Sequence, residues 1–303
     1  MAIADSVLTL ADLNDWSFSG TALAVLGHPI KHSISPAMHN AALAELARSD
    51  NRFGSWRYFR FDVPPEDLSR ALDLLRAKNF HGLNLTVPHK AIAFDRVAAI
   101  DPAARLIGAI NTLVSTENGW LGFNTDGYGL AVGIREDLGF DIAGSDIILL
   151  GAGGAARGAA VECLQRRCRS LWVANRTTAN LDVLLKIIQP VANGIPVHGF
   201  DPQSPPAELP ASAIVINATS AGLRESDVPP ANLVQFPRPV GVYDMIYNPP
   251  QTSFLAQAAS LGIANANGLS MLINQGARAL SHWTGLLTPV AAMRYAAKQA
   301  MKA

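Results

Sequence analysis

One short stretch of the chain, an apolar run that leads into a glycine-rich turn, limits the folds open to it more than any other feature. Residues 146–150 (DIILL) form a nearly continuous apolar run, which suits a strand buried on both faces of a parallel sheet. The run is followed by GAGGAA at 151–156, by a helical pattern that reaches Arg166, and by a second apolar run at 171–174. This order predicts a βαβ unit and therefore a parallel sheet flanked by helices.

The glycine-rich turn matches the pattern G-x-G-x-x-G/A, which carries weight here because a buried strand precedes it and a helix follows it. Gly151 permits the tight turn, Gly153 lets the backbone approach a pyrophosphate, and Ala156 lets the helix pack closely on the strand. Free N–H groups at the helix N-terminus would bind the phosphates. A glycine-rich turn without a ligand is the alternative. The residues expected to form this Rossmann-type dinucleotide site are Gly151, Ala152, Gly153, Gly154 and Ala155.

The residues after the second strand predict which dinucleotide binds. Folds that bind NAD usually place Asp or Glu there, to bond the ribose 2′-hydroxyl. This chain has Asn175, Arg176 and Thr177 instead. A guanidinium and two neutral side chains suit a 2′-phosphate, so the expected cofactor is NADP(H). The alternative is a surface arginine that binds no ligand.

The rest of the chain predicts an α/β fold with two α/β domains. Strand patterns at 22–26, 57–62, 82–85 and 111–115 alternate with helical patterns at 35–46 and 65–78, which predicts a first block with a largely parallel sheet. A second block begins near Thr125. It contains a helix over 127–138, the βαβ unit, and strands at 195–197, 213–216 and 240–243. Helices at 252–261, 270–283 and 289–302 follow, and residues 1–20 look like an extension before the first strand.

Charge and composition exclude several classes of protein. The chain has 24 Lys plus Arg and 24 Asp plus Glu, so its zero net charge provides no basic field for nucleic acid. Its apolar runs are short and broken by Gly or Pro, so no membrane span is expected. Residues 1–20 contain no Lys or Arg, which argues against a secretory or transit signal. Cys163 and Cys168 lack metal-binding spacing and indicate unpaired thiols in a reducing cytoplasm.

Three polar segments carry candidate substrate groups. Ser33 and Ser35 stand just before a helix start and could hold a carboxylate, or Ser35 could simply cap the helix. Asp126 lies in a glycine-flanked turn at the junction of the two blocks, where a ligand cleft is expected, or it caps the helix that follows. Lys90 ends the segment NLTVPHK and could transfer a proton, or it is a solvated lysine at a helix start.

Taken together, these segments resemble the shikimate dehydrogenase family. Each of its signature stretches has a counterpart here, in the same order, from about residue 21 to the C-terminal helices. They are GHPIKHSISPAMHN at 27–40, NLTVPHK at 84–90, GAINT at 108–112, NTDG at 124–127, GAGGA at 151–155, NRT at 175–177, NATSAG at 217–222, DMIYNP at 244–249 and GLSMLINQG at 268–276.

The resemblance implies the reversible reduction of 3-dehydroshikimate to shikimate by NADPH, a cytoplasmic step of chorismate and aromatic amino-acid biosynthesis. In the family, hydride passes to the C3 carbonyl. Lys90 would be the general acid in reduction and the base in oxidation, and Asp126 would hold its ammonium group and bond a substrate hydroxyl. Ser33, Ser35 and Tyr247 would bind the carboxylate. The groups expected to bond the ring hydroxyls or to orient Lys90 are Asn84, Thr86, Asn111 and Gln275, while Met245 and Gly268 would line the nicotinamide.

The resemblance also implies how the chain divides into domains. A discontinuous substrate-binding domain would comprise residues 21–124 and 267–303, an NADP-binding Rossmann domain would comprise 125–266, and a cleft would separate the two. Residues 1–20 would be an extension without an assigned function. The expected partner is the small-molecule substrate, with no metal, nucleic acid or membrane, and a homodimer is left open.

Two alternatives to this function stay open. A quinate/shikimate or aminoshikimate dehydrogenase would relax the substrate or cofactor choice. NADP users in the family often carry a further basic residue where this chain has Asn180, so the preference for NADP would rest mainly on Arg176. A non-catalytic ligand sensor on the same fold is the remoter alternative, since fold alone does not fix function. The presence of both Lys90 and Asp126 argues against it.

Overall fold

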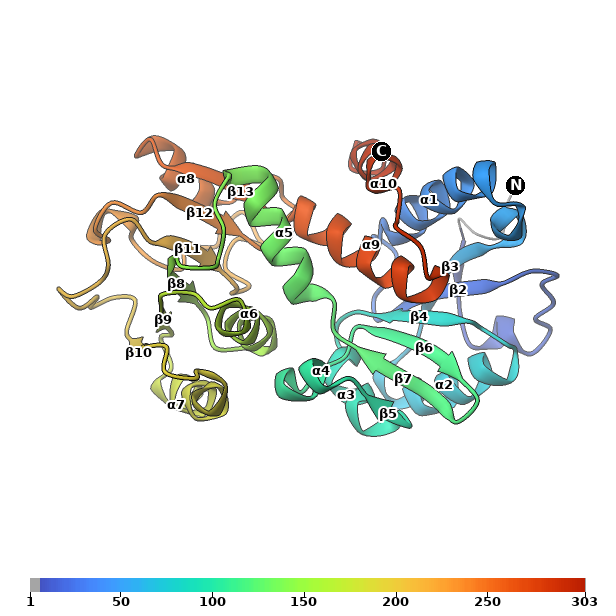
Figure 1. Ribbon diagram of the computed structural model, residues 1–303. Helices are drawn as coiled ribbons and strands as arrows, with labels where there is room; N and C mark the ends of the chain where they lie inside the picture. The colour runs from blue at the N-terminus through green and yellow to red at the C-terminus, as the bar shows by residue number, and fades with distance from the viewer. Residues whose placement is uncertain (1–5, 303) are drawn as a thin grey trace. The chain divides into compact units, whose positions relative to one another are not determined.

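The computed structural model of the protein describes residues 6–302 and divides into two compact units (Figure 1). The first unit contains the described residues up to Thr125 together with those from Gln275 onward, and the second contains Asp126–Asn274. The chain therefore passes between the units twice, once just before Asp126 and once after Asn274. The second passage lies further along the chain than the predicted boundary at 266/267. The assignment of these segments to functional domains stays a prediction.

The sheet of the first unit has seven strands in the order β1-β3-β2-β4-β6-β7-β5. All neighbouring pairs are parallel except those of β6, which runs antiparallel to both β4 and β7. The prediction of a largely parallel sheet is thus confirmed, but the β6–β7 hairpin was not predicted. The strands are β1 (Val7–Leu8), β2 (Ala22–Gly27), β3 (Arg57–Asp62), β4 (Gly82–Leu85), β5 (Ala99–Ile100), β6 (Thr112–Thr116) and β7 (Gly119–Phe123).

The described part of the N-terminal segment belongs to this unit, so the prediction that residues 1–20 are an extension is corrected for residues 7–18. Strand β1 pairs in parallel with β3 at the edge of the sheet. Leu13 is completely buried, and the Trp16 ring meets the Phe59 ring edge-on at a centroid distance of 5.0 Å. These contacts bury apolar area in the core. The first five residues of the predicted extension lie outside the described residues.

Helices of the first unit cover both faces of its sheet. Phe59 and Phe61 on β3 join the core cluster that includes Leu68, Leu72 and Leu75 of α2, and the side chains that alternate with them point to the opposite face. Helices α1 and α10 pack side by side (Figure 1). The helices are α1 (Ser35–Ser49), α2 (Leu68–Ala77), α3 (His89–Ile92), α4 (Pro102–Ile107), the part of α9 (Leu269–Thr284) from 275 onward, and α10 (Val290–Ala300).

The second unit is a parallel sheet of six strands in the order β10-β9-β8-β11-β12-β13, which confirms the predicted Rossmann-type domain. The chain leaves β8 in one direction for β9 and β10 and later returns beside β8 as β11, so the strand order reverses between β8 and β11. The strands are β8 (Asp146–Leu150), β9 (Ser170–Ala174), β10 (Val197–Phe200), β11 (Ile214–Asn217), β12 (Gly241–Asp244) and β13 (Ala264–Asn267).

The helices of the second unit complete its layers. Helices α5 and α6 pack together, while Phe254, Leu255 and Ala258 of α8 join the core cluster with Ile148 and Leu150 of β8. Helix α7 and strand β13 were not predicted. The helices are α5 (Asp126–Leu138), α6 (Gly154–Gln165), α7 (Thr178–Ile188), α8 (Ser253–Ser260) and the start of α9.

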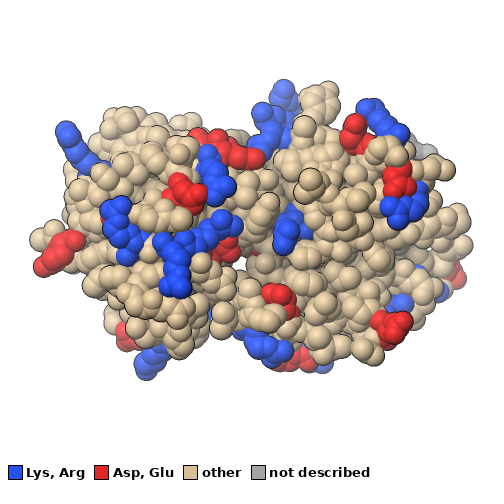
Figure 2. Space-filling model, in the orientation of Figure 1, with Lys and Arg blue, Asp and Glu red and all other residues tan. Residues whose placement is uncertain are grey.

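Two exclusions made from the sequence can be compared with the structure. Cys163 and Cys168 are free, as predicted, and both are buried; burial raises the pKa of the Cys168 thiol to about 11. Within residues 6–302, no helix is long and apolar enough to cross a membrane. Acidic and basic side chains both lie on the face shown in Figure 2, and several Lys and Arg side chains stand close together on the left of the view.

Candidate functional site

The first unit brings three of the predicted substrate residues into one hydrogen-bonded network, which begins at Asn84 on β4. The Asn84 amide group donates to the carbonyl oxygen of Asn111 at 3.0 Å and to Thr112 Oγ1 at 3.1 Å. Its carbonyl oxygen accepts from the buried hydroxyl of Tyr58 at 2.7 Å. Both amide hydrogens are therefore in use, and the Tyr58 hydroxyl fixes which way the amide points. Sequence reasoning missed Tyr58 and Thr112, because neither stands out in a strand pattern.

Asn111 extends the network to the last residue of the first segment and to α9. Its Nδ2 donates to Thr125 Oγ1 at 3.0 Å and to Gln275 Oε1 at 3.3 Å, and its Oδ1 accepts from the Thr125 backbone N–H at 2.9 Å. Asn111 is 1% exposed, whereas Gln275 is partly exposed. A buried, satisfied amide such as Asn111 holds its neighbours in one arrangement. Asp126, the next residue after Thr125, is the first residue of α5.

The segment that carries Thr86 and Lys90 is a tight turn at the end of β4. The Thr86 N–H donates to Leu26 O on β2, and the His89 N–H donates back to Thr86 O at 2.8 Å. The Val87–Pro88 peptide between them is cis. His89 is buried, its Nε2 bonds to Val63 O at 2.9 Å, and burial lowers its pKa. These contacts fix the start of α3, so the position of Lys90, which is partly exposed, is set by its buried neighbour.

Ser33 and Ser35 lie where α1 begins. The residue that caps α1 is Ile34, whose side chain makes no cap hydrogen bond, and Ser35 is already helical. The alternative that Ser35 is the helix cap is therefore wrong. Ser33 Oγ accepts the Ser35 backbone N–H at 3.4 Å, which leaves the Ser33 hydroxyl hydrogen free to point elsewhere. Both hydroxyls stand at a helix N-terminus, which favours an anion such as a carboxylate.

In the second unit, the glycine-rich turn leaves room for a ligand. Gly151 has a φ of +112°, and a Cβ there would lie 3.1 Å from Ala218 O, so only glycine fits without strain. A Cβ on Gly153 or Gly154 would instead meet nothing within 4 Å. No side chain caps the start of α6. An uncapped helix N-terminus beside open space suits a pyrophosphate, so the residues present fit a dinucleotide.

The turn between β9 and α7 holds the residues predicted to select the cofactor. Asn175 Nδ2 donates to Thr177 O at 2.9 Å, and Thr177 is the N-cap residue of α7. Arg176 between them is exposed and makes no hydrogen bond or ion pair within residues 6–302. An exposed, unengaged guanidinium fits a 2′-phosphate. Asn180 is also exposed, in the first turn of α7.

The stretch after β12 holds Met245 and Tyr247 in place through a buried carboxylate. Asp244 is completely buried; its Oδ1 accepts from Asn217 Nδ2 and from the Ile246 N–H, both at 3.0 Å, and its Oδ2 accepts from Thr252 Oγ1 at 2.7 Å. Burial raises the pKa of Asp244, and these hydrogen bonds oppose that shift. Burial also raises the pKa of Tyr247. Sequence reasoning gave Asp244 no role, although it lies inside the quoted motif DMIYNP.

Gly268 lies against Met245. A Cβ on Gly268 would sit 2.1 Å from Met245 O, and its N–H donates to Ile246 O at 3.0 Å. The two residues predicted to line the nicotinamide are thus in contact through their backbones.

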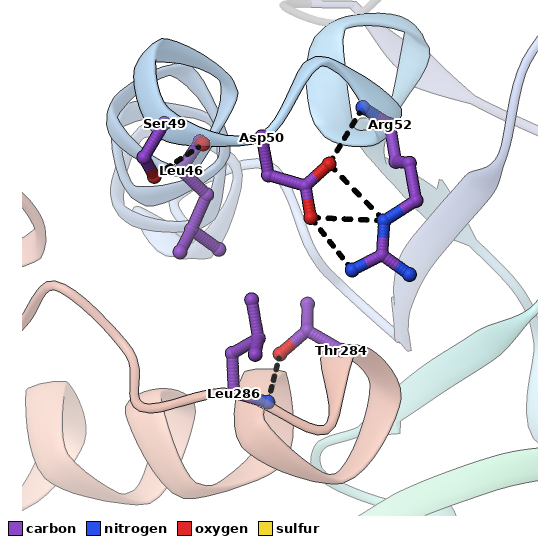
Figure 3. A network of polar contacts seen from close by, with 6 residues as sticks. All are labelled: Leu46, Ser49, Asp50, Arg52, Thr284 and Leu286. Atoms are coloured by element: carbon purple, nitrogen blue, oxygen red, sulfur yellow. Dashed lines mark hydrogen bonds and ion pairs between the residues drawn. The ribbon is translucent and has the colours of Figure 1, made fainter.

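A shallow hollow of about 300 Å³ in the first unit contains none of the predicted site residues. Figure 3 shows polar contacts beside it: the Asp50 carboxylate accepts from Arg52, and Thr284 Oγ1 accepts the Leu286 N–H. The hollow adjoins the C-terminal end of α1, whereas Ser35 begins that helix. Its lining residues are Glu45, Leu46, Arg48, Ser49, Leu287, Thr288 and Pro289.

Comparisons with known proteins show which sequences this chain is similar to. A family profile described as the shikimate dehydrogenase substrate binding domain matches residues 25–113, and one described as the shikimate 5′-dehydrogenase C-terminal domain matches residues 268–298. Among curated proteins, the NADP(+) shikimate dehydrogenase of Moorella thermoacetica is 42% identical over 289 residues, covering 93% of this chain and 94% of its own.

Solved structures extend the similarity to the whole fold. A shikimate 5-dehydrogenase from Thermus thermophilus, in complex with NADP(H) and shikimate, is 34% identical and superposes with a TM-score of 0.79 over 92% of this chain and 99% of its own. A ligand-free 5-ketofructose reductase of Gluconobacter sp. strain CHM43 is 30% identical, with a TM-score of 0.82 over 93% of this chain and 99% of its own. The same fold thus occurs in reductases named for different substrates.

Proposed function

This chain belongs to the shikimate dehydrogenase family, and we propose that it catalyses the reversible, NADPH-dependent reduction of 3-dehydroshikimate to shikimate. It is then an oxidoreductase acting on a CH–OH group, in aromatic amino-acid biosynthesis. The observation that carries the proposal is the pairing of two sites in one chain. The second unit has an open glycine turn with an unengaged Arg176, and the first has the ordered polar network around Asn111.

Residues of the second unit would hold the cofactor. The turn at 151–155 and the free N–H groups of α6 would bind the pyrophosphate, and Asn175, Arg176 and Thr177 would bind the adenosine 2′-phosphate. Met245 and Gly268 would line the nicotinamide. When bound, NADPH supplies the hydride. Because Arg176 is the one basic residue that we assign to the 2′-phosphate, the preference for NADP rests chiefly on it.

Lys90 would manage the proton of the reaction. Reduction of the carbonyl leaves an alkoxide that must gain a proton, and an ammonium group can both stabilise the charge and donate that proton. In the reverse direction, the neutral amine would take the proton from the hydroxyl. Asp126 would bond a substrate hydroxyl as the carboxylate partner in this step. The turn closed by Thr86 and His89 supports this role, because it holds the lysine at a fixed place.

The remaining groups would orient the substrate. Ser33 and Ser35 at the start of α1, with Tyr247, would bind the carboxylate. Thr86 and Gln275 would bond the ring hydroxyls. Asn111 and Asn84 fit this set differently, since the amide hydrogens of both are already engaged. We assign Asn111 the role of orienting Gln275, and Asn84 the role of orienting Asn111 and Thr112.

A second candidate within the fold is a relaxed or altered substrate choice. Quinate, aminoshikimate or a keto sugar could be the substrate, and the 5-ketofructose reductase neighbour gives this candidate a specific basis. Ser33 and Ser35 favour a carboxylated substrate. We further propose a cytoplasmic location, from the biosynthetic role and the free thiols, and a homodimer as the assembly to test by light scattering.

An initial-rate comparison tests the function directly. Purified protein would be assayed with shikimate and with quinate, each with NADP and NAD, and with 5-ketofructose and NADPH. We expect the highest kcat/KM for shikimate with NADP. A higher value for quinate or for 5-ketofructose would replace the proposed substrate. The absence of turnover with all of them, together with binding of shikimate, would favour a sensor.

A further inference from the structure

We propose that Arg60 is a positioning residue that sets the affinity for the substrate carboxylate, by holding the loop that carries Ser33. This inference rests on the proposed function, because it concerns how the same site recognises its substrate. It adds a residue that lies outside every motif on which the family resemblance was based.

The contacts of Arg60 with the loop are direct. Arg60 lies on β3, and its Nη1 donates to Lys31 O at 2.8 Å and to Ser33 O at 3.2 Å. Along β3 it alternates with Phe59 and Phe61, which point into the apolar core, so Arg60 lies on the other face. Tyr58, two residues before it, is on that same face and meets His39 of α1. The arginine is thus directed toward the loop that precedes α1.

The hydrogen bonds fix Ser33 at three points. Arg60 holds its carbonyl oxygen, Ile30 O accepts its backbone N–H at 3.0 Å, and its own Oγ accepts the Ser35 N–H. With the main chain held on both sides and the hydroxyl oxygen occupied, the hydroxyl hydrogen is the group left to donate to a ligand. A loop that is ordered before the ligand arrives does not lose conformational freedom on binding, which strengthens the binding.

The charge of Arg60 acts in the same direction. Hydrogen bonds from a charged donor are stronger than neutral ones. The guanidinium polarises the Lys31 and Ser33 carbonyl groups and adds positive potential near the site where a carboxylate is expected. A loss of Arg60 should therefore weaken the ground-state affinity for a carboxylated substrate, without changing the proton transfer at Lys90.

A matched pair of arginines on one strand makes the test specific. Arg57 also lies on β3 and also donates through Nη1 to two main-chain carbonyl groups, those of Gly54 at 3.2 Å and Trp56 at 2.6 Å. It is exposed and holds no proposed site residue. Arg57→Ala is therefore the control for removing a strand arginine with two carbonyl partners. Arg60→Gln keeps a donor without the charge, and gives a second variant should Arg60→Ala fold poorly.

The experiment measures kcat and KM for shikimate and for NADP in the wild type, Arg60→Ala, Arg60→Gln and Arg57→Ala. For Arg60→Ala we expect the KM for shikimate to rise about tenfold, as loss of charge-assisted hydrogen bonds predicts. The kcat and the KM for NADP should stay within about twofold of the wild-type values. A twofold change corresponds to a free energy of only about 0.4 kcal/mol (RT ln 2). The KM of Arg60→Gln for shikimate should fall between those of the wild type and Arg60→Ala. The KM of Arg57→Ala for shikimate should match that of the wild type.

A double variant distinguishes action through Ser33 from a general effect. If Arg60 works by placing Ser33, then Arg60→Ala should raise the KM for shikimate much less in a Ser33→Ala background than in the wild type. Independent, multiplying effects would overturn the inference, as would equal KM values for Arg60→Ala and the wild type. A wild type that does not oxidise shikimate would instead contradict the proposed function, so the two failures are distinguishable.

Discussion

His39 is a buried histidine whose ring nitrogens have no hydrogen-bond partner within the described residues. Its ring stacks on Tyr58 at a centroid distance of 4.1 Å with an interplanar angle of 3°. Complete burial lowers the pKa of His39 to about 3. Since Tyr58 in turn donates to Asn84, the ring supports the candidate site by packing rather than by charge. Protonation of this buried imidazole would therefore lower the stability of the fold.

We expect the free energy of unfolding of the wild type to fall as the pH is lowered, over a pH range set by the pKa of His39. Its pKa is about 3 when folded and 6.5 in the reference state, so the unfolded chain binds the extra proton first as the pH falls. The contribution is complete above pH 6.5 and is lost toward pH 3, at about 1.4 kcal/mol per pH unit. Thermal unfolding of the wild type and of His39→Phe from pH 7 to pH 4 would test this. The difference in stability between the wild type and His39→Phe should change with pH at that slope. A difference that stays constant from pH 7 to pH 4 would contradict this prediction.

Lys90→Ala should lower kcat by about 10²–10⁴-fold while shikimate still binds, because general acid–base catalysis contributes that much. Isothermal titration would measure the binding, and initial rates would measure kcat. Lys90→Arg is the informative companion, since it keeps the positive charge but does not give up its proton readily. If the lysine transfers a proton, both variants should be slow; near-normal turnover of Lys90→Arg would mean that a fixed charge is enough.

The roles of some single residues could be predicted from the sequence, whereas the roles of others could not. The roles expected of Gly151 and Arg176 follow from chemistry that their types dictate, a positive φ and a fixed charge. Tyr58 and Arg60 were not predicted, because a tyrosine and an arginine in a strand give no sign of which distant loop they touch. Their roles depend on pairing between β3 and segments far away in sequence.

Among the elements, the stretch from β12 to α9 shows how closely backbones must pass in the candidate cofactor region. Gly268→Ala should destabilise the second unit by about 2–3 kcal/mol and weaken NADP binding, because its Cβ would lie 2.1 Å from Met245 O. Gly139→Ala is the control: it has a φ of +75° but meets nothing within 4 Å, so it should cost only about 1 kcal/mol. Denaturant unfolding and NADP titration would measure both. An equal loss in the free energy of unfolding for the two variants would contradict the steric argument.

Elements with strong local patterns were predicted, and those without were missed. Strand β8, its turn and α6 were foreseen, because an apolar run and glycines at fixed spacing mark them. Strand β13 has the sequence ANAN, and alanine and asparagine are poor strand formers, so only its pairing with β12 reveals it. Strand β7 contains two glycines and is held in a hairpin with β6. In both cases, tertiary contacts override the local sequence.

At the scale of the whole molecule, residues 7–18 matter to the core of the first unit. Deleting residues up to 19 would remove β1, buried Leu13 and the rings of Trp16 and Phe18. Loss of a buried Leu commonly costs about 2–5 kcal/mol, and the partly buried Trp16 and Phe18 pack against the same core, so we expect a large fall in the melting temperature. A variant that lacks only residues 2–5 is the control. If the longer deletion left the melting temperature unchanged, these residues would be a dispensable extension, as the sequence predicted.

The first unit is built from two segments of chain that flank the second, as residues 275–302 complete what residues 6–125 begin. A ribosome makes Asp126–Asn274 before it makes α10 and most of α9. The dinucleotide-binding sheet can therefore form while the chain is still being synthesised, whereas Gln275 joins Asn111 only afterwards. During that interval the nascent first unit exposes the face of α1 that α10 later covers.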